Sequence, residues 1–215
     1  MRTTRMNRLG LGGAILLAAL ALGATPAQAT APTNGTASLG SVAFTKGNQS
    51  QVSVPSLAPC SLQGPATASS GPVVKSGVTL GGGTTTCTTT TANGAKTTQS
   101  VATGKDFALT ALAGTTLRIK TYGATCTGSS TGTSAGWTFG GMSGLTGLPA
   151  QIPSGYVHQV KQGSTVLAEI TFGEYILPNP ADGSIALNTL HIRFKPASHI
   201  TGDIVLGATA CTPVG

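Results

Sequence analysis

The fold is decided by the stretch Ser184-Ile-Ala-Leu-Asn-Thr-Leu-His-Ile-Arg-Phe-Lys195, whose second half alternates strictly between apolar and polar residues. Successive side chains of a β-strand point to opposite faces, so this alternation predicts a half-buried strand with one wet face. The core side would hold Leu190, Ile192 and Phe194, and the wet side would hold His191, Arg193 and Lys195.

Two further runs flank this strand and share its character. In Ser164-Thr-Val-Leu-Ala-Glu-Ile-Thr-Phe-Gly-Glu-Tyr175 the period predicts Val166, Ala168, Ile170 and Phe172 on the core side, opposite Leu167, Glu169 and Thr171. Gly202-Asp-Ile-Val-Leu-Gly-Ala-Thr-Ala-Cys211 is more apolar, as expected of a strand covered on both faces. Gly, Pro, Asn and Asp cluster in the segments that link the three runs, so we expect an antiparallel core with tight connections.

The rest of the chain also reads as strands. Asn93-Gly94 lies between two Thr-rich runs and is a strong hairpin signal. The segment 59–83 reads as a loop except for residues 73–80, and no helical period of useful length appears after the N-terminal leader. We therefore predict an all-β protein, an antiparallel β-sandwich of about ten strands that occupies residues 41–215 as one domain.

The first 29 residues are typical of a cleaved secretory signal helix. Arg2, Arg5 and Arg8 precede an apolar run, and Ala27-Gln-Ala29 supplies small residues for cleavage after Ala29. Residues 30–40 are small and polar, and we expect a flexible N-terminal segment there. No later run approaches the roughly 18 apolar residues of a membrane span, so the prediction is a secreted, extracellular protein without one in its mature chain.

Four cysteines follow the leader, and an even number in an exported chain predicts two disulfides. Three pairings are possible, and we favour Cys60–Cys87 and Cys126–Cys211 because the first joins neighbours and the second joins two predicted strands. Zinc is the alternative, but neither a C-x-x-C pair nor a His at ligand spacing supports it. The sequence thus predicts no metal and no cofactor.

Charge is sparse, at 8% of residues. Twelve Lys and Arg less the three leader arginines leave nine against five Asp and Glu, so the mature chain carries about +4. Nucleic-acid binders concentrate basic and aromatic groups, and this composition argues against that class. Four of the nine basic groups, together with one histidine, fall on the wet faces of two predicted strands: Arg118 and Lys120, and His191, Arg193 and Lys195. If both faces belong to one sheet, they form a basic strip suited to anionic polymers.

Catalytic signatures are weak. Gly128-Ser-Ser-Thr-Gly132 matches the Gly-x-Ser-x-Gly pattern of serine hydrolases, but it lies in loop-like sequence without the strand and helix that the motif needs. The five carboxylates are scattered and show no calcium-loop pattern. A Thr tract over residues 84–91 evokes ice-binding proteins, yet a single uninterrupted tract lacks the regular Thr-x-Thr rows of that class.

Several segments resemble secreted actinobacterial proteins of the choice-of-anchor P family. The likeness is carried by Leu187-Asn-Thr-Leu-His-Ile192 and Asp203-Ile-Val-Leu-Gly-Ala208, and it covers the C-terminal half better than the N-terminal third. It implies a β architecture and a surface or extracellular address, and it assigns no activity and no catalytic residue.

We therefore expect a non-enzymatic structural or binding module at or beyond the cell envelope, with anionic cell-wall polymers as its candidate partner. The alternative is a secreted hydrolase whose site assembles from distant residues.

Overall fold

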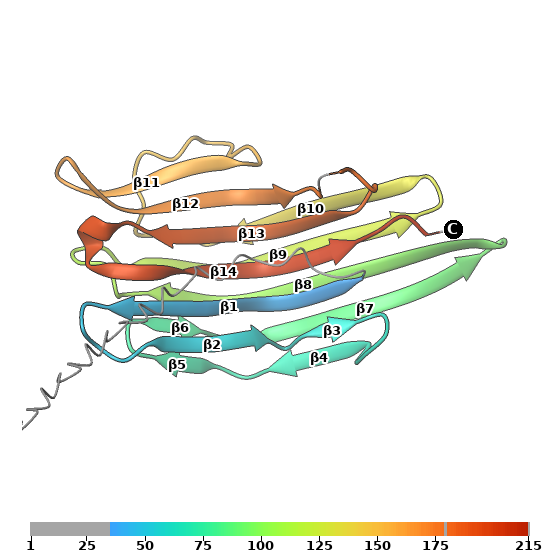
Figure 1. Cartoon of the computed structure of the whole chain (residues 1–215), viewed down its shortest axis with the longest axis horizontal. Coiled ribbons are helices and arrows are strands. Elements are labelled where there is room, and N and C mark those ends of the chain that lie inside the picture. Colours follow the sequence, from blue (N-terminus) through green and yellow to red (C-terminus); the bar gives the residue numbers. More distant parts are fainter. Residues whose placement is uncertain (1–34, 179, 215) are drawn as a thin grey trace, which may run out of the picture.

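Two antiparallel sheets lie face to face in the computed structural model, which describes residues 35–178 and 180–214 (Figure 1). The first sheet has the order β11 (Tyr156–Gln162), β12 (Thr165–Ile176), β13 (Ile185–Phe194), β14 (Ile200–Cys211), β1 (Thr36–Lys46) and β2 (Val52–Leu57), and β3 (Cys60–Ser61) also pairs with β1. Every strand pairing in it is antiparallel. The predicted C-terminal runs therefore form its centre.

The second sheet is built around β8 (Ala95–Leu109), which has β9 (Leu117–Ser129) and then β10 (Gly132–Gly140) on one side. Its other side is shared by β7 (Gly83–Ala92) and β6 (Val78–Leu80), which pair with β4 (Thr67–Ser70) and β5 (Val73–Lys75), respectively. The only helical turn in the described residues is η1 (Pro196–Ser198). The all-β antiparallel sandwich is confirmed.

The strand count differs from the expected ten, because the described residues contain fourteen strands. Four of the additional elements are short pieces of two to four residues within the segment 60–80, most of which reads as loop in the sequence. Strand β1 begins at Thr36, so residues 36–40, expected to be flexible, pair with β14 and belong to the sheet. The predicted signal helix lies outside the described residues.

The β7–β8 hairpin turns where the sequence predicts it. Ala92 pairs with Ala95, and the two residues between them, Asn93 and Gly94, have φ angles of 51° and 78°. Positive φ at both positions defines the type I′ turn, whose twist matches that of paired strands.

Large apolar side chains fill the half of the sandwich that contains the C-terminal end of β13. Phe172 and Ile192 are fully buried and Phe194 is 8% exposed, which confirms the predicted core face. The placement of Leu167 on the wet face is wrong, because this residue is 4% exposed and packs in the core. The cause is a bulge: Val160 pairs with Ala168 and Lys161 with Val166, so Leu167 is the extra residue on β12.

A second irregularity crosses the first sheet at mid-length. On each of three adjacent strands, two consecutive residues are both buried, and the three pairs lie side by side in the register of the sheet. They are Phe172 and Gly173 of β12, Thr189 and Leu190 of β13, and Leu206 and Gly207 of β14. A Cβ on Gly173 would meet the Trp137 side chain of β10, and Thr189 donates a hydrogen bond to the Gly123 carbonyl of β9, 2.8 Å away. Both members of these pairs therefore face the opposite sheet.

The irregularity needs glycine, because Gly173 and Gly207 have φ angles of 54° and 59°. Its consequence lies on the outer face. In a regular strand, successive outward side chains are two residues apart. Here the inward pair separates them by three residues, as with Asn188 and His191 on β13. Glu174 of β12 is thereby turned outward beside them.

Both disulfides join one sheet to the other. Cys60 of β3 bonds Cys87 of β7, and Cys126 of β9 bonds Cys211 of β14, which confirms the favoured pairing. The bonds close loops across sequence separations of 27 and 85 residues. Loop-closure entropy gives each a stabilisation of about 3–5 kcal/mol.

We predict that Ile192→Ala lowers the free energy of unfolding by about 2–4 kcal/mol, through lost apolar burial and the cavity left at a fully packed position. Val157→Ala, at a β11 residue that is 48% exposed, is the matched control and should change it by less than about 0.5 kcal/mol. Chemical denaturation with the disulfides intact measures both. Equal losses for the two variants would contradict the assignment of faces.

Candidate functional site

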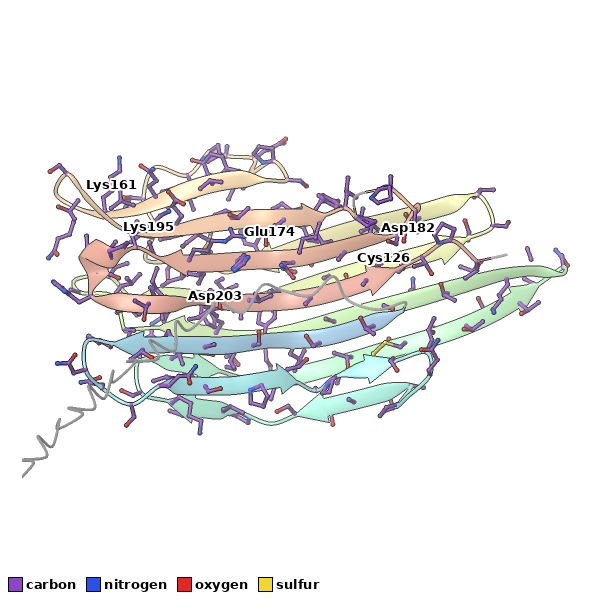
Figure 2. The ribbon with its side chains drawn as sticks, in the orientation of Figure 1. Cys126, Lys161, Glu174, Asp182, Lys195 and Asp203 are labelled. Carbon is purple, nitrogen blue, oxygen red and sulfur yellow. A yellow bond between two sulfur atoms is a disulfide. The ribbon has the colours of Figure 1, made fainter. Side chains whose placement is uncertain are left out.

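His191 lies between two carboxylates on the outer face of the first sheet. Its Nδ1 atom is 2.6 Å from Glu174 Oε2, and its Nε2 atom is 2.9 Å from Asp203 Oδ2. Figure 2 labels Glu174 on β12 and Asp203 on β14, the strands on either side of β13. The imidazole is 5% exposed, so one side chain connects three adjacent strands at a nearly buried position.

Glu174 has three partners in all. Asn188 donates from Nδ2 to its Oε2 atom at 2.9 Å, and Arg193 forms an ion pair with its Oε1 atom. Arg193 also donates to the Thr171 hydroxyl at 3.1 Å. We name the set Glu174, Asn188, His191, Arg193 and Asp203 the β13 charge cluster.

Lys195 extends the same row toward the end of the strand, where its Nζ atom lies 2.6 Å from Glu169 Oε2. A carboxylate on a neighbouring strand therefore partners each of His191 and Arg193 on β13, and also Lys195 just after it. Register brings two of the carboxylates close to their partners. Glu169 of β12 and Asp203 of β14 lie opposite Arg193, and each binds the cationic side chain two residues from it, Lys195 and His191, respectively.

The cluster shifts the proton affinity of its members. Burial favours the neutral form of Glu174, but hydrogen bonds from His191, Arg193 and Asn188 outweigh it and lower the pKa of the carboxyl to about 2 from an ordinary 4.5. Burial alone would lower the pKa of His191, and Arg193 acts in the same direction. Hydrogen bonds to Asp203 and Glu174 reverse this and hold the pKa above its ordinary value of 6.5. The histidine thus favours the doubly protonated form, with one N–H directed at each carboxylate.

This arrangement determines what the histidine can do chemically. An imidazolium with both nitrogens bound to carboxylates has no lone pair to accept a proton or to bind a metal. The described part of the chain contains no group of three His, Cys, Asp or Glu residues arranged to hold a metal ion. The geometry suits an electrostatic clamp across β12, β13 and β14.

The predicted basic strip does not form. Arg118 and Lys120 lie on β9 in the second sheet, whereas His191 and Arg193 lie on β13 in the first and Lys195 directly follows that strand. The five side chains therefore do not share a sheet, and His191, Arg193 and Lys195 interact with carboxylates. Arg118 and Lys120 remain exposed and have no carboxylate partner among the described ion pairs.

The sequence analysis did not identify Lys105 as a neighbour of Arg118 and Lys120 on β9. It is exposed on β8, opposite Thr121 of β9 and one residue along from Lys120. It also missed the convergence of Glu174 and Asp203 on His191, because the carboxylates are scattered along the chain. The register of three strands brings them together, and the spacing within one strand does not reveal it.

The Gly-x-Ser-x-Gly match lies at the β9–β10 turn. The motif serine, Ser130, is an exposed residue of the turn. The hydroxyl of the preceding residue, Ser129, is 2.9 Å from the Thr131 hydroxyl and donates to the Gly132 carbonyl at 3.2 Å. The segment joins two antiparallel strands of one sheet, so the strand-to-helix elbow of that hydrolase motif is not its setting.

None of the protein-family models, curated proteins or solved structures with which the chain was compared matches it. Among residues 35–178 and 180–214, no helix has the length and apolar character that a bilayer crossing requires.

The cluster predicts a stability optimum at mildly acidic pH. The stabilisation by His191 is complete below its unfolded pKa of 6.5 and is lost as pH rises through the higher folded value. The stabilisation by Glu174 is present above 4.5 and is lost as pH falls toward about 2. The contribution of the cluster to the free energy of unfolding should therefore be greatest between 4.5 and 6.5.

Replacement of the histidine isolates this contribution. His191→Asn should cost about 1–3 kcal/mol at pH 5.5, because two carboxylates lose a charged donor, and the cost should shrink at alkaline pH. Partial burial lowers the pKa of His158, so this residue changes the stability with pH in the opposite direction. It is present in both proteins, and its effect cancels in the difference. Urea denaturation across the pH range provides the comparison. A difference that does not change with pH would mean that folding leaves the pKa of His191 at its unfolded value, and a cost that grows as pH rises would mean that the pKa is lowered.

Proposed function

We propose that this protein is an exported, non-enzymatic β-domain that acts as a structural or binding module at or beyond the cell envelope. The observation that carries the proposal is the pair of disulfides, each joining the two sheets of a single sandwich. Such bonds persist in oxidising compartments outside the cytosol. The N-terminal sequence supports the same address, and the resemblance to choice-of-anchor P proteins agrees with it.

The state of the β13 charge cluster favours a non-enzymatic role. A hydrolase with a histidine-activated serine or cysteine would need a histidine with a free nitrogen next to the nucleophile. His191 instead binds a carboxylate through each nitrogen, and the nearby Thr171 hydroxyl accepts a hydrogen bond from Arg193. The cluster is better suited to fastening strands than to proton transfer.

The contact surface that we propose for anionic cell-wall polymers is the basic group on the second sheet: Lys105, Arg118 and Lys120. All three are exposed, lie on the adjacent strands β8 and β9, and have no partner among the described ion pairs. Asp106 stands next to Lys105 and reduces the local charge. The resulting attraction is modest, long-ranged and sensitive to salt.

We predict that Arg118→Ser/Lys120→Ser elutes from an immobilised anionic cell-wall polymer at clearly lower salt than the parent. Loss of two unpaired cations from one site reduces the local potential that holds the polymer. The measurement is the salt concentration at elution, started from low ionic strength.

The matched control is Lys75→Ser/Lys96→Ser, which removes the same charge from exposed residues on β5 and β8. It should elute close to the parent. Equal shifts for the two double variants would show that net charge alone governs retention, and salt-independent binding by the parent would exclude the electrostatic contact.

A further inference from the structure

The far half of β7 is an edge strand without the usual protection. Strand β4 covers β7 only over residues 83–86, and the Cys87 amide donates to the Ala66 carbonyl at 2.7 Å. Beyond that point, residues 88–92 pair with β8 alone and are all exposed. Figure 1 shows this hairpin reaching past the ends of the other strands.

The orphan main-chain groups can be assigned. In an antiparallel strand the N–H and C=O of one residue point to the same side, and successive residues alternate. The main-chain N–H of Cys87 points away from β8, so the main-chain N–H and C=O groups of Thr89 and Thr91 also point away from β8. Neither residue has a main-chain hydrogen-bond partner on that side within the described chain.

The other free edges of the two sheets are blunted by recognised devices. Pro55 interrupts β2, and β5 has only three residues, one of which is Lys75. Strand β4 has four residues, and β11 carries the exposed Lys161 and lies against the β12 bulge at Leu167. Strand β10 is flanked by the end of β12 and the segment that follows it, since Tyr175 donates to the Ala135 carbonyl and Thr133 to the Gly183 carbonyl.

Residues 88–92 have none of these devices. Four consecutive threonines followed by alanine carry no charge, no proline and no bulge, and β-branched residues favour extended pairing. An exposed, uncharged and regular edge is a template for another strand.

We propose that this edge pairs with the same edge of a second copy of the chain, antiparallel, about a two-fold axis at Thr90. This register joins Thr89 of each copy to Thr91 of the other, so both orphan residues exchange two hydrogen bonds with their counterparts. It places Thr90 opposite Thr90 in a non-hydrogen-bonded pair, and threonine pairs are favourable at such positions.

A second copy fits this edge better than a foreign peptide, because the strand is complementary to itself. No charge opposes the approach of an identical strand, and each copy offers the same orphan donors and acceptors. The contact is isologous and uses the one unprotected edge found in the described residues, so association stops at the dimer. The small interface implies weak, concentration-dependent association.

Cysteine cross-linking tests the register. Thr90→Cys places two thiols opposite each other on the axis, and it should form a disulfide-linked dimer at least about tenfold faster than the control, through their high effective concentration. The control is Thr84→Cys, which is exposed on the same strand but lies far from its counterpart in this register. Equal rates for the two variants would overturn the proposal.

Sedimentation velocity from micromolar to millimolar concentration tests the association itself. The parent should shift from monomer toward dimer, and Thr89→Pro should remain monomeric, because proline removes an outward N–H and leaves the bonds to β8 intact. Circular dichroism confirms that the variant is folded. If it is not, the Thr90→Cys comparison still decides the matter. A parent that stays monomeric, or a dimer that survives Thr89→Pro, would refute the edge pairing.

Discussion

The consecutive inward side chains on β12, β13 and β14 are the constraint on which much of the first sheet depends. A regular strand would send Gly173 and Thr189 outward and would place Glu174 and Asn188 inside an apolar core. Glycine at two of the three central positions allows the left-handed backbone that reverses the alternation. The same reversal of the alternation packs Trp137 against the Gly173 main chain and turns the Glu174 side chain toward His191.

The two ends of the sandwich are stabilised by different means. One end buries Phe44, Phe107, Phe194 and several leucines and isoleucines, so apolar burial is large there. The interior of the other end contains Leu187 but is made mainly of small or hydroxylated residues, including Ala37, Ala102, Ser100 and Thr98. Little apolar area is gained from such residues. Both disulfides lie at this end, and they supply by chain constraint what the small side chains cannot supply by burial.

Alternation predicted the core faces of β12 and β13, and Asn-Gly predicted the β7–β8 turn, because both signals are local in sequence. Leu167 was misplaced because a bulge depends on how the partner strand is paired. The supposed basic strip failed for a related reason: sequence shows which residues share a strand face, but it does not show which strands share a sheet. The His191 contacts with Glu174 and Asp203 needed the register of three strands, which no single run of residues encodes.

The β13 charge cluster and the Thr-rich edge of β7 both follow from the way in which a small number of charged residues is distributed between the two sheets. The chain has few ionisable groups, and strands of the first sheet carry three of its five carboxylates, two of them held against His191 and one against Lys195. The second sheet is left with hydroxyl side chains on β7 and much of β8, where solubility comes from threonine. Threonine provides polarity without repulsion, and it also favours extended pairing. The distribution that fastens one sheet through ion pairs therefore leaves the β7 edge of the other without the charges that would keep strands apart.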